Sequence, residues 1–375
     1  MKKALQNGIL IFCIALVIRL GVLALIVFVS GKTVEQLSLW FDGASYQTIA
    51  QSFPLPYGGE AIEHFRHYPL FPFIIYIVTV VIKNSVISSY LTVICASALS
   101  VVIFYYIAQQ FSAAPFLLAC IFAVFPEKWL STSIFIYSEP VFMLFFLAGI
   151  LCYVKKEYRY GALFIGLSCL ARPVGIFFAA LFFLWQRKEQ QRCLKEQFWA
   201  GVLLFIPFVV FVLYLKYRFS PGPADIQAMP SSGGLVTMPA QGIQVLFPFV
   251  PLWQGLCDHS VLFLRKIYST SICLLYTVVA GKMVFDAVRE KTITFLQVWY
   301  IPYYLFIVSV QGNVPGDWLV AAPRFFLPIA PAGIVYICRN WNRRLLVSFL
   351  TAAFVLGVIF SLAVVEMHQG RYHVV

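Results

Sequence analysis

Charge is what this sequence has least of. Lys, Arg, Asp and Glu make up only 11% of its 375 residues, whereas a soluble domain carries about 25%. So few charged side chains cannot cover a soluble surface, which excludes an ordinary cytosolic enzyme. The 37 Phe and 20 Tyr exclude a disordered chain, because disordered segments are poor in aromatic residues. With 61% apolar residues, the composition predicts an all-α polytopic membrane protein that sits in a lipid bilayer.

The nine cysteines also lack a pattern. Their number is odd, no Cys-x-x-Cys occurs, and no His/Cys spacing typical of a metal site is present. The sequence therefore predicts neither a disulfide framework nor a metal site. The net charge of +12 does not indicate nucleic-acid binding, because the basic residues form short runs between apolar stretches.

These basic runs predict the topology, because positive residues mark the inside face of a membrane protein. With the N-terminus inside, one arrangement of about eleven transmembrane helices places most basic clusters inside. The expected helices are 8–30, 86–108, 114–126, 138–154, 160–171, 173–186, 198–219, 267–285, 293–310, 325–338 and 345–366. The short apolar segment 69–82 is predicted to be a half-buried juxtamembrane helix. The alternative is that 69–82 crosses the bilayer and 114–126 does not.

The longer polar segments all fall on the predicted exterior face, and we expect the chemistry of a single domain, 1–375, to occur there. These segments are 31–68, 220–258, 311–324 and the shorter 127–137. The Gly- and Pro-rich segment 220–258 is interpreted either as a lid over the acceptor or as an unordered loop.

A break between the expected helices 160–171 and 173–186 indicates a cavity. It falls at Arg172-Pro173, and non-helical backbone at membrane depth survives only where protein or a water-filled cavity covers it. Arg324 stands at the exterior end of another expected helix. Both arginines are candidate phosphate ligands, since ionisable groups at membrane depth are costly and usually functional. Arg19, near the midplane of the first expected helix, is interpreted as structural.

The first exterior segment holds the best candidate for a general base. The run 42–52 predicts a short helix with Tyr46, Ile49 and Ala50 on one face and Asp42 at its N-terminus. Asp42 is interpreted either as an N-cap or as a base beside a closed membrane face, and the two roles are compatible.

Two further clusters follow. His64, Arg66, His67 and Tyr68 precede an apolar segment, where the basic groups form either a phosphate cradle or an interfacial anchor. Ser138-Glu139-Pro140 predicts a helix start. Glu139 either complements the helix dipole or is a second acid facing the same cavity as Asp42.

In this order, the motifs resemble the integral-membrane glycosyltransferases of the GT-C fold, most closely the PIG-V family (the second mannosyltransferase of GPI-anchor assembly) and its prokaryotic relatives. A Trp-Asp-x-x-x-Tyr-x-x-Ile-Ala pattern matches residues 42–50, with Phe41 inserted between Trp40 and Asp42. An aromatic Phe-Pro-Leu-Tyr-Pro pattern matches 68–72. A Ser-Glu pair matches 138–139, and an Arg-x-x-Gly element matches 172–175.

The resemblance implies a GT-C-like bundle and a hexosyltransferase, typically for mannose. Its donor would be a polyprenyl-phosphate sugar (dolichyl phosphate in eukaryotes), and its acceptor a hydroxyl of a glycan, lipid or protein. It implies an inverting reaction without a nucleotide and often without a metal. The site would face the extracytosolic side of a bacterial or archaeal plasma membrane, or of the endoplasmic reticulum in a eukaryote.

On this hypothesis Asp42 is the base and Glu139 its reserve, and Tyr46 and Tyr68 position the acceptor. The cations that would hold the donor phosphate are Arg172, Arg324, Arg66, His64 and His67. Two other functions fit the same features. A transporter or flippase also uses broken helices and buried arginines, and a glycan ligase shares the outer-face cavity and the basic clusters.

Overall fold

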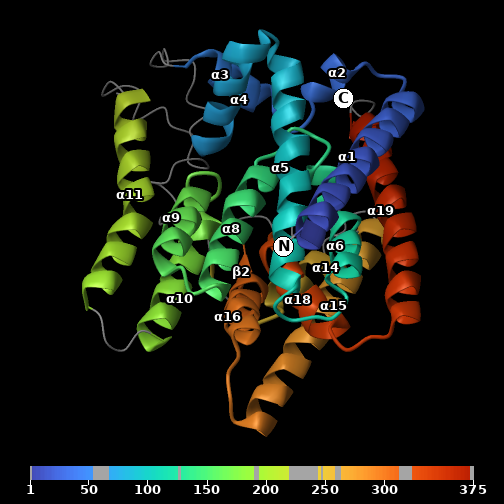
Figure 1. Ribbon diagram of the computed structural model, residues 1–375. Helices are drawn as coiled ribbons and strands as arrows, with labels where there is room; N and C mark the ends of the chain where they lie inside the picture. Colours follow the sequence, from blue (N-terminus) through green and yellow to red (C-terminus); the bar gives the residue numbers. More distant parts are fainter. Residues whose placement is uncertain are drawn as a thin grey trace. The chain divides into compact units, whose positions relative to one another are not determined.

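The computed structural model describes residues 2–53, 67–125, 128–189, 194–218, 244–245, 248–257, 263–311 and 323–371, and these are almost entirely helical (Figure 1). The chain divides into two compact units. One comprises Met1–Ser220 with Cys338–Val375, and the other Pro221–Ile337. This division by contacts does not test the prediction of a single functional domain.

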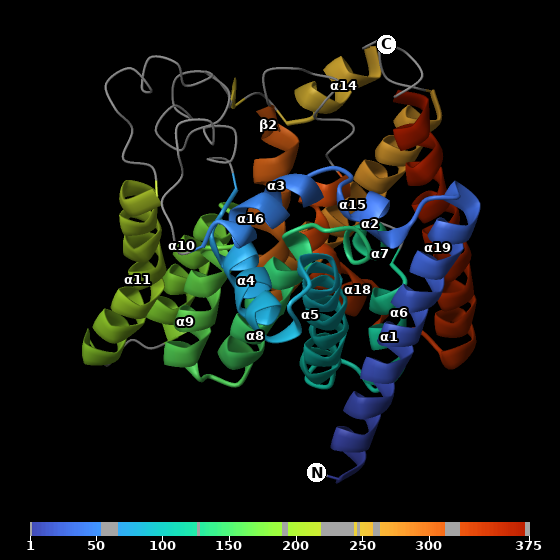
Figure 2. The ribbon, with the colours of Figure 1, turned by 90° about the horizontal axis from the view of Figure 1, so that it is seen from above.

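The first unit is a helical bundle. Its helices are α1 (Lys2–Ser30), α2 (Val34–Ser38), α3 (Gly43–Gln51), α4 (Leu70–Ile82), α5 (Ser85–Ala108), α6 (Pro115–Ala123), α7 (Trp129–Thr132), α8 (Glu139–Val154), α9 (Tyr158–Cys169), α10 (Val174–Glu189), α11 (Leu194–Arg218) and α19 (Arg343–Arg371). Helix α5 packs against α1, α4, α6 and α8. Within this unit α1 lies alongside α19, while α9 packs against α8 on one side and against α10 and α11 on the other (Figures 1 and 2).

Small hydroxyl side chains allow α5 to occupy the centre of this bundle. Ser88, Ser97 and Ser100 are fully buried, and each donates a hydrogen bond to a carbonyl three or four residues earlier in its own helix. Each hydroxyl thereby donates within α5, although Ser97 Oγ also accepts from Arg19 of α1 and Ser100 Oγ lies 3.5 Å from the Pro140 carbonyl of α8. Their small volume lets neighbouring backbones approach closely.

The same close approach joins α9 to α11. A Cβ on Gly166 would lie 2.9 Å from both the carbonyl oxygen of Leu204 and Cγ of Pro207. Only glycine fits at this crossing without displacing the α11 backbone. The contact thereby fixes the position along α11 from which its later residues reach the candidate site.

The protein is a helical membrane protein. Among the described residues, three helices are long and apolar enough to cross a bilayer: α1, α5, and Lys266–Glu290 of α15 (Phe263–Glu290). Large apolar side chains stay exposed on them, such as Phe28 at 84% and Val278 at 68%. Ten of the eleven helices predicted from the sequence appear as α-helices, with their ends shifted by at most six residues. The exception is 325–338, where a 3₁₀ turn at 327–329 precedes an α-helix that begins only at Ala330.

Two short helices differ in how far they follow the prediction. Helix α4 buries Phe71, Pro72 and Ile75 on one face, as expected for a half-buried helix over 69–82. Helix α6 is shorter than the predicted 114–126, because the backbone leaves helical geometry at Val124 (φ −113°, ψ 11°). At 1.5 Å per residue, nine residues extend about 14 Å, whereas the hydrocarbon core is about 30 Å thick. Helix α6 alone is therefore too short for the span predicted over 114–126.

The second unit contains α14 (Val250–Cys257), α15, α16 (Phe295–Ser309), the 3₁₀ turn η2 (Leu327–Ile329) and most of α18 (Ala330–Cys338). Strands β1 (Gln244–Val245) and β2 (Val310–Gln311) pair antiparallel, with Gln244 opposite Gln311. The segment 220–258, predicted as a loop, is thus helical at 250–257 and forms a strand at 244–245. Its Gly- and Pro-rich part, and most of 311–324, lie outside the described residues.

Aromatic rings form the core of this second unit. The ring of Tyr276 stacks on Phe326 at 4.6 Å and on Tyr300 at 5.9 Å. The Tyr300 hydroxyl donates to the carbonyl of Tyr276 (3.0 Å), and the Trp299 indole N–H donates to that of Pro328 (3.0 Å). Buried Tyr and Trp side chains are stable in such a core because their polar atoms have partners.

Candidate functional site

Asp42 stands at the start of α3, as predicted, and the buried face of this helix carries Tyr46, Ile49 and Ala50. The predicted side-chain cap is wrong, however, because the half-buried Asp42 carboxylate makes no cap hydrogen bond. N-cap residues normally have an extended backbone, whereas Asp42 is already helical (φ −83°, ψ −2°). The carboxylate is therefore not committed to the end of α3.

Aromatic contacts of the two residues just before Asp42 join this region to the segment that precedes Glu139. The Trp40 ring stacks on Phe135 at 5.9 Å, and the Phe41 ring lies 5.3 Å from Phe135 and 5.5 Å from Tyr137. Phe41 has a left-handed backbone (φ 55°), a strained conformation for a bulky residue. The structure thus places the inserted Phe41 in this contact.

A second set of contacts joins α3 to residues 67–71. The ring of Tyr46 lies 4.5 Å from His67 and 4.7 Å from Phe71. His67 is only 6% exposed and packs against α3. His64 and Arg66, predicted for the same cluster, lie outside the described residues.

Tyr68 lies next to the break between α9 and α10. Its ring stacks on Phe211 of α11 at 4.7 Å, and the nearby Leu70 amide donates to the carbonyl of Leu170 (2.9 Å). Burial raises the pKa of the Tyr68 phenol, as does the thiol of Cys169, while the charge of Arg172 acts in the opposite direction. The hydroxyl is therefore protonated at neutral pH. Among the residues that the structure describes, it has no hydrogen-bond partner.

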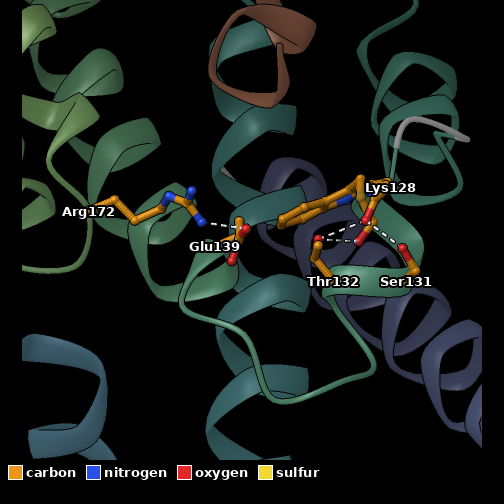
Figure 3. A network of polar contacts seen from close by, with 6 residues as sticks. Lys128, Ser131, Thr132, Glu139 and Arg172 are labelled. Carbon is orange, nitrogen blue, oxygen red and sulfur yellow. Dashed lines mark hydrogen bonds and ion pairs between the residues drawn. The ribbon is translucent and has the colours of Figure 1, made fainter. Parts of the chain in front are cut away.

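Arg172 occupies the break itself, as predicted, and forms an ion pair with Glu139 through Nη1 and Oε1 (Figure 3). The Glu139 side chain is 2% exposed and that of Arg172 is 18% exposed. Helix α8 begins at Glu139 with Pro140 in its first turn, as predicted from Ser138-Glu139-Pro140. Ser138 stands at the N-cap position, but its side chain makes no cap hydrogen bond.

The turn that leads toward Glu139 was not singled out from the sequence. The carbonyl oxygen of Lys128 accepts hydrogen bonds from Ser131 (3.0 Å) and Thr132 (2.8 Å), close to the Glu139–Arg172 pair (Figure 3). Lys128 itself has a left-handed backbone (φ 44°). The sequence did offer a signal for this segment, because aromatic residues are frequent over 129–137. Two of them, Phe135 and Tyr137, make the contacts with Trp40 and Phe41.

Arg19 is fully buried in α1, and its contacts agree with the structural interpretation. Its Nε donates to Ser97 Oγ (2.5 Å), its Nη1 donates to the Ala15 carbonyl (3.0 Å), and its guanidinium lies 5.6 Å from the centre of the Trp129 ring. The guanidinium of Arg19 is thus stabilised by a hydroxyl of α5, a carbonyl of its own helix and the face of an aromatic ring.

The structure brings six of the predicted site residues together in the first unit. They are Asp42, Tyr46, His67, Tyr68, Glu139 and Arg172. Arg324 belongs to the second unit, where it is half-buried just before the stacked Phe326. The arrangement combines a carboxylate, a protonated phenol and an arginine held by a buried acid, a set suited to accepting a proton and binding an anion.

Comparison with protein-family models finds none that matches this chain, and comparison with curated proteins finds no significant match. Any functional assignment therefore rests on the residues of the chain and on their geometry.

Proposed function

We propose that the protein is a membrane glycosyltransferase of the GT-C type. In this proposal it moves a hexose, mannose in the family it resembles, from a polyprenyl-phosphate donor to an acceptor hydroxyl on the extracytosolic face. The carrying observation is that the motifs around Asp42, Tyr68, Glu139 and Arg172 meet through direct contacts, although they are spread over about a third of the chain.

The reaction needs a group that accepts a proton from the acceptor hydroxyl. In this proposal the Asp42 carboxylate takes that proton while the acceptor oxygen bonds to the anomeric carbon. The bond from that carbon to the phosphate oxygen breaks at the same time. A carboxylate that is half-buried and not used as a helix cap suits this role.

The reaction also needs positive charge at the leaving group. The phosphate carries one negative charge as a sugar diester and gains a second as it leaves. Arg172 would stabilise that charge with charge-assisted hydrogen bonds. From the sequence, Tyr68 is expected to position the acceptor. Because its protonated hydroxyl lies near Arg172, we propose instead that it donates a further hydrogen bond to the phosphate. Arg324, Arg66, His64 and His67 remain proposed as further ligands of the phosphate.

The arrangement in the membrane belongs to the same proposal. About eleven crossings, an inside N-terminus and basic inside loops would place 31–53 and 67–68 at the outer face. The donor lipid could then lie in the outer leaflet, with its phosphate at the depth of the α9–α10 break.

A transfer assay with the purified protein tests this function. Incubation with a set of polyprenyl-phosphate hexoses and glycan or lipid acceptors should yield a product heavier by one hexose. Asp42→Asn should reduce transfer about 10²–10⁴-fold, the usual cost of losing a base. Glu35→Gln is the matched control, because Glu35 is an exposed acid of the same exterior segment and transfer should stay within a few-fold of wild type.

Three other outcomes would contradict the proposal. Transfer by Asp42→Asn within a few-fold of wild type would remove Asp42 from the mechanism. Movement of the lipid-linked sugar across sealed vesicles without a new glycosidic bond would indicate a flippase. A product heavier by a whole glycan would indicate a ligase.

A further inference from the structure

We infer that Glu139 positions Arg172 to bind the donor phosphate and does not itself exchange a proton with the substrate. The inference rests on the proposed function, because it assigns Glu139 a role within that site. It replaces the expectation that Glu139 is a reserve acid beside Asp42.

The backbone of Arg172 is fixed by the break that carries it. Its N–H donates to the carbonyl of Ser168 (3.1 Å), and its own carbonyl accepts from the amide of Gly175 (3.2 Å). A Cβ on Gly175 would lie 2.8 Å from the backbone nitrogen of Cys169, so the chain passes here at a distance that only glycine tolerates. This explains the glycine of Arg-Pro-Val-Gly: it closes the turn against the end of α9.

A fixed backbone does not orient a long arginine side chain, and Glu139 supplies the missing constraint. The carboxylate lies in the first turn of α8, where the helix N-terminus favours a negative charge. Helix α8 is itself well anchored, since Phe142 and Phe146 are fully buried a few residues later. The ion pair therefore joins a rigid helix end to the Arg172 guanidinium.

The pair leaves the guanidinium able to act on a substrate. Glu139 contacts the guanidinium at one end, through Nη1. The Arg172 side chain is 18% exposed, whereas that of Glu139 is 2% exposed. A phosphate can therefore approach the arginine without meeting the carboxylate. For Glu139 to act as a base, the buried pair would have to open.

A double-mutant cycle on phosphate binding tests this role. The probe is a polyprenyl monophosphate without sugar, and its affinity is measured for the wild type, Glu139→Gln, Arg172→Gln and the double variant. We expect each single substitution to weaken binding roughly tenfold, and Glu139→Gln to add less than twofold once Arg172 is replaced. Glu35→Gln is the matched acid-to-amide control, because Glu35 is exposed and outside the proposed site, and it should leave the affinity unchanged.

Turnover and folding supply the remaining readouts. Glu139→Gln should raise the KM for the donor more than it lowers kcat, with an unchanged pH profile of kcat. Glu139→Asp keeps the charge with a shorter reach and should restore part of the affinity. If Glu139→Gln does not fold, the cycle can be run with Glu139→Asp and Arg172→Lys. The effects of these two substitutions on phosphate affinity should again be less than additive.

Several results would overturn the inference. Among them are unchanged phosphate affinity in Glu139→Gln, an equal loss in the Arg172→Gln background, and no phosphate binding by the wild type. The binding cycle needs no sugar transfer, so the two proposals fail separately. If the two substitutions are coupled in phosphate binding but no sugar is transferred, only the transferase proposal is rejected. If sugar is transferred but the effects of the two substitutions on phosphate affinity are additive, only the positioning role of Glu139 is rejected.

Discussion

A Cβ on Gly43 would lie 2.2 Å from the carbonyl oxygen of Ser38, and Gly43 therefore sets how closely α3 approaches the end of α2. The same Cβ would be 3.3 Å from Cβ of Ile136, in the segment before Glu139. The residue after Asp42 thus controls the distance between the proposed base and the segment that precedes α8.

Gly43→Ala should consequently disrupt the site. The methyl group would meet backbone atoms that cannot move aside, and overpacking typically costs about 1–3 kcal/mol. We expect a lower unfolding temperature in detergent and a large loss of transfer. Gly21→Ala is the control, since nothing lies within 4 Å of its Cβ, and it should keep both. Equal behaviour of the two variants would contradict the close approach.

Arg172→Gln should destabilise the protein more than replacing both members of its ion pair. The single substitution removes a direct counter-charge from a carboxylate that is 2% exposed, which typically costs about 3–5 kcal/mol. In the double variant with Glu139→Gln no charge remains to be compensated, so part of the stability should return. Thermal unfolding in detergent measures both. A double variant less stable than Arg172→Gln would contradict this account.

The Tyr68→Phe substitution tests the role of the Tyr68 hydroxyl independently of the role of its ring. The ring can still stack on Phe211, so stability without a donor should be unchanged or slightly higher. Loss of one hydrogen bond to the phosphate should reduce transfer by about 2–10-fold, corresponding to about 0.5–1.5 kcal/mol. Tyr68→Ala should lower stability as well, because it removes the stacked ring. Wild-type transfer by Tyr68→Phe would show that the hydroxyl does not contact the substrate.

Arg19→Met should be tolerated. Within the described part of the chain no acid pairs with Arg19, and replacing a buried charge by an apolar side chain of similar size is often neutral. Ser97→Ala should be the more harmful change, because it takes a partner from a charge that stays buried, at a cost of about 1–3 kcal/mol. Transfer and unfolding temperature report both effects. A folded Arg19→Met variant without transfer would instead place Arg19 in the mechanism.

The helices were the part of the structure that could be predicted best. Apolar stretches, and breaks such as Arg172-Pro173, are local properties of a chain that must satisfy its backbone hydrogen bonds within each segment. The start of α8 at Glu139 and the buried face of α3 were predictable for the same reason. The cap of Asp42 was not, because its backbone conformation depends on the contacts of Trp40 and Phe41 with another part of the chain.

The sequence by itself determined that this is a helical membrane protein, roughly where most of its helices lie, and which side chains could carry chemistry. Only the tertiary structure decided that Glu139 faces Arg172, that His67 packs on Tyr46 and that the aromatic residues around Asp42 meet 135–137. Helix formation depends on neighbours in the chain. The pairing of the buried Glu139 with the half-buried Arg172 depends on which helices pack together. Packing is decided over the whole bundle by residue size, as at Gly43 and Gly166, where only glycine fits.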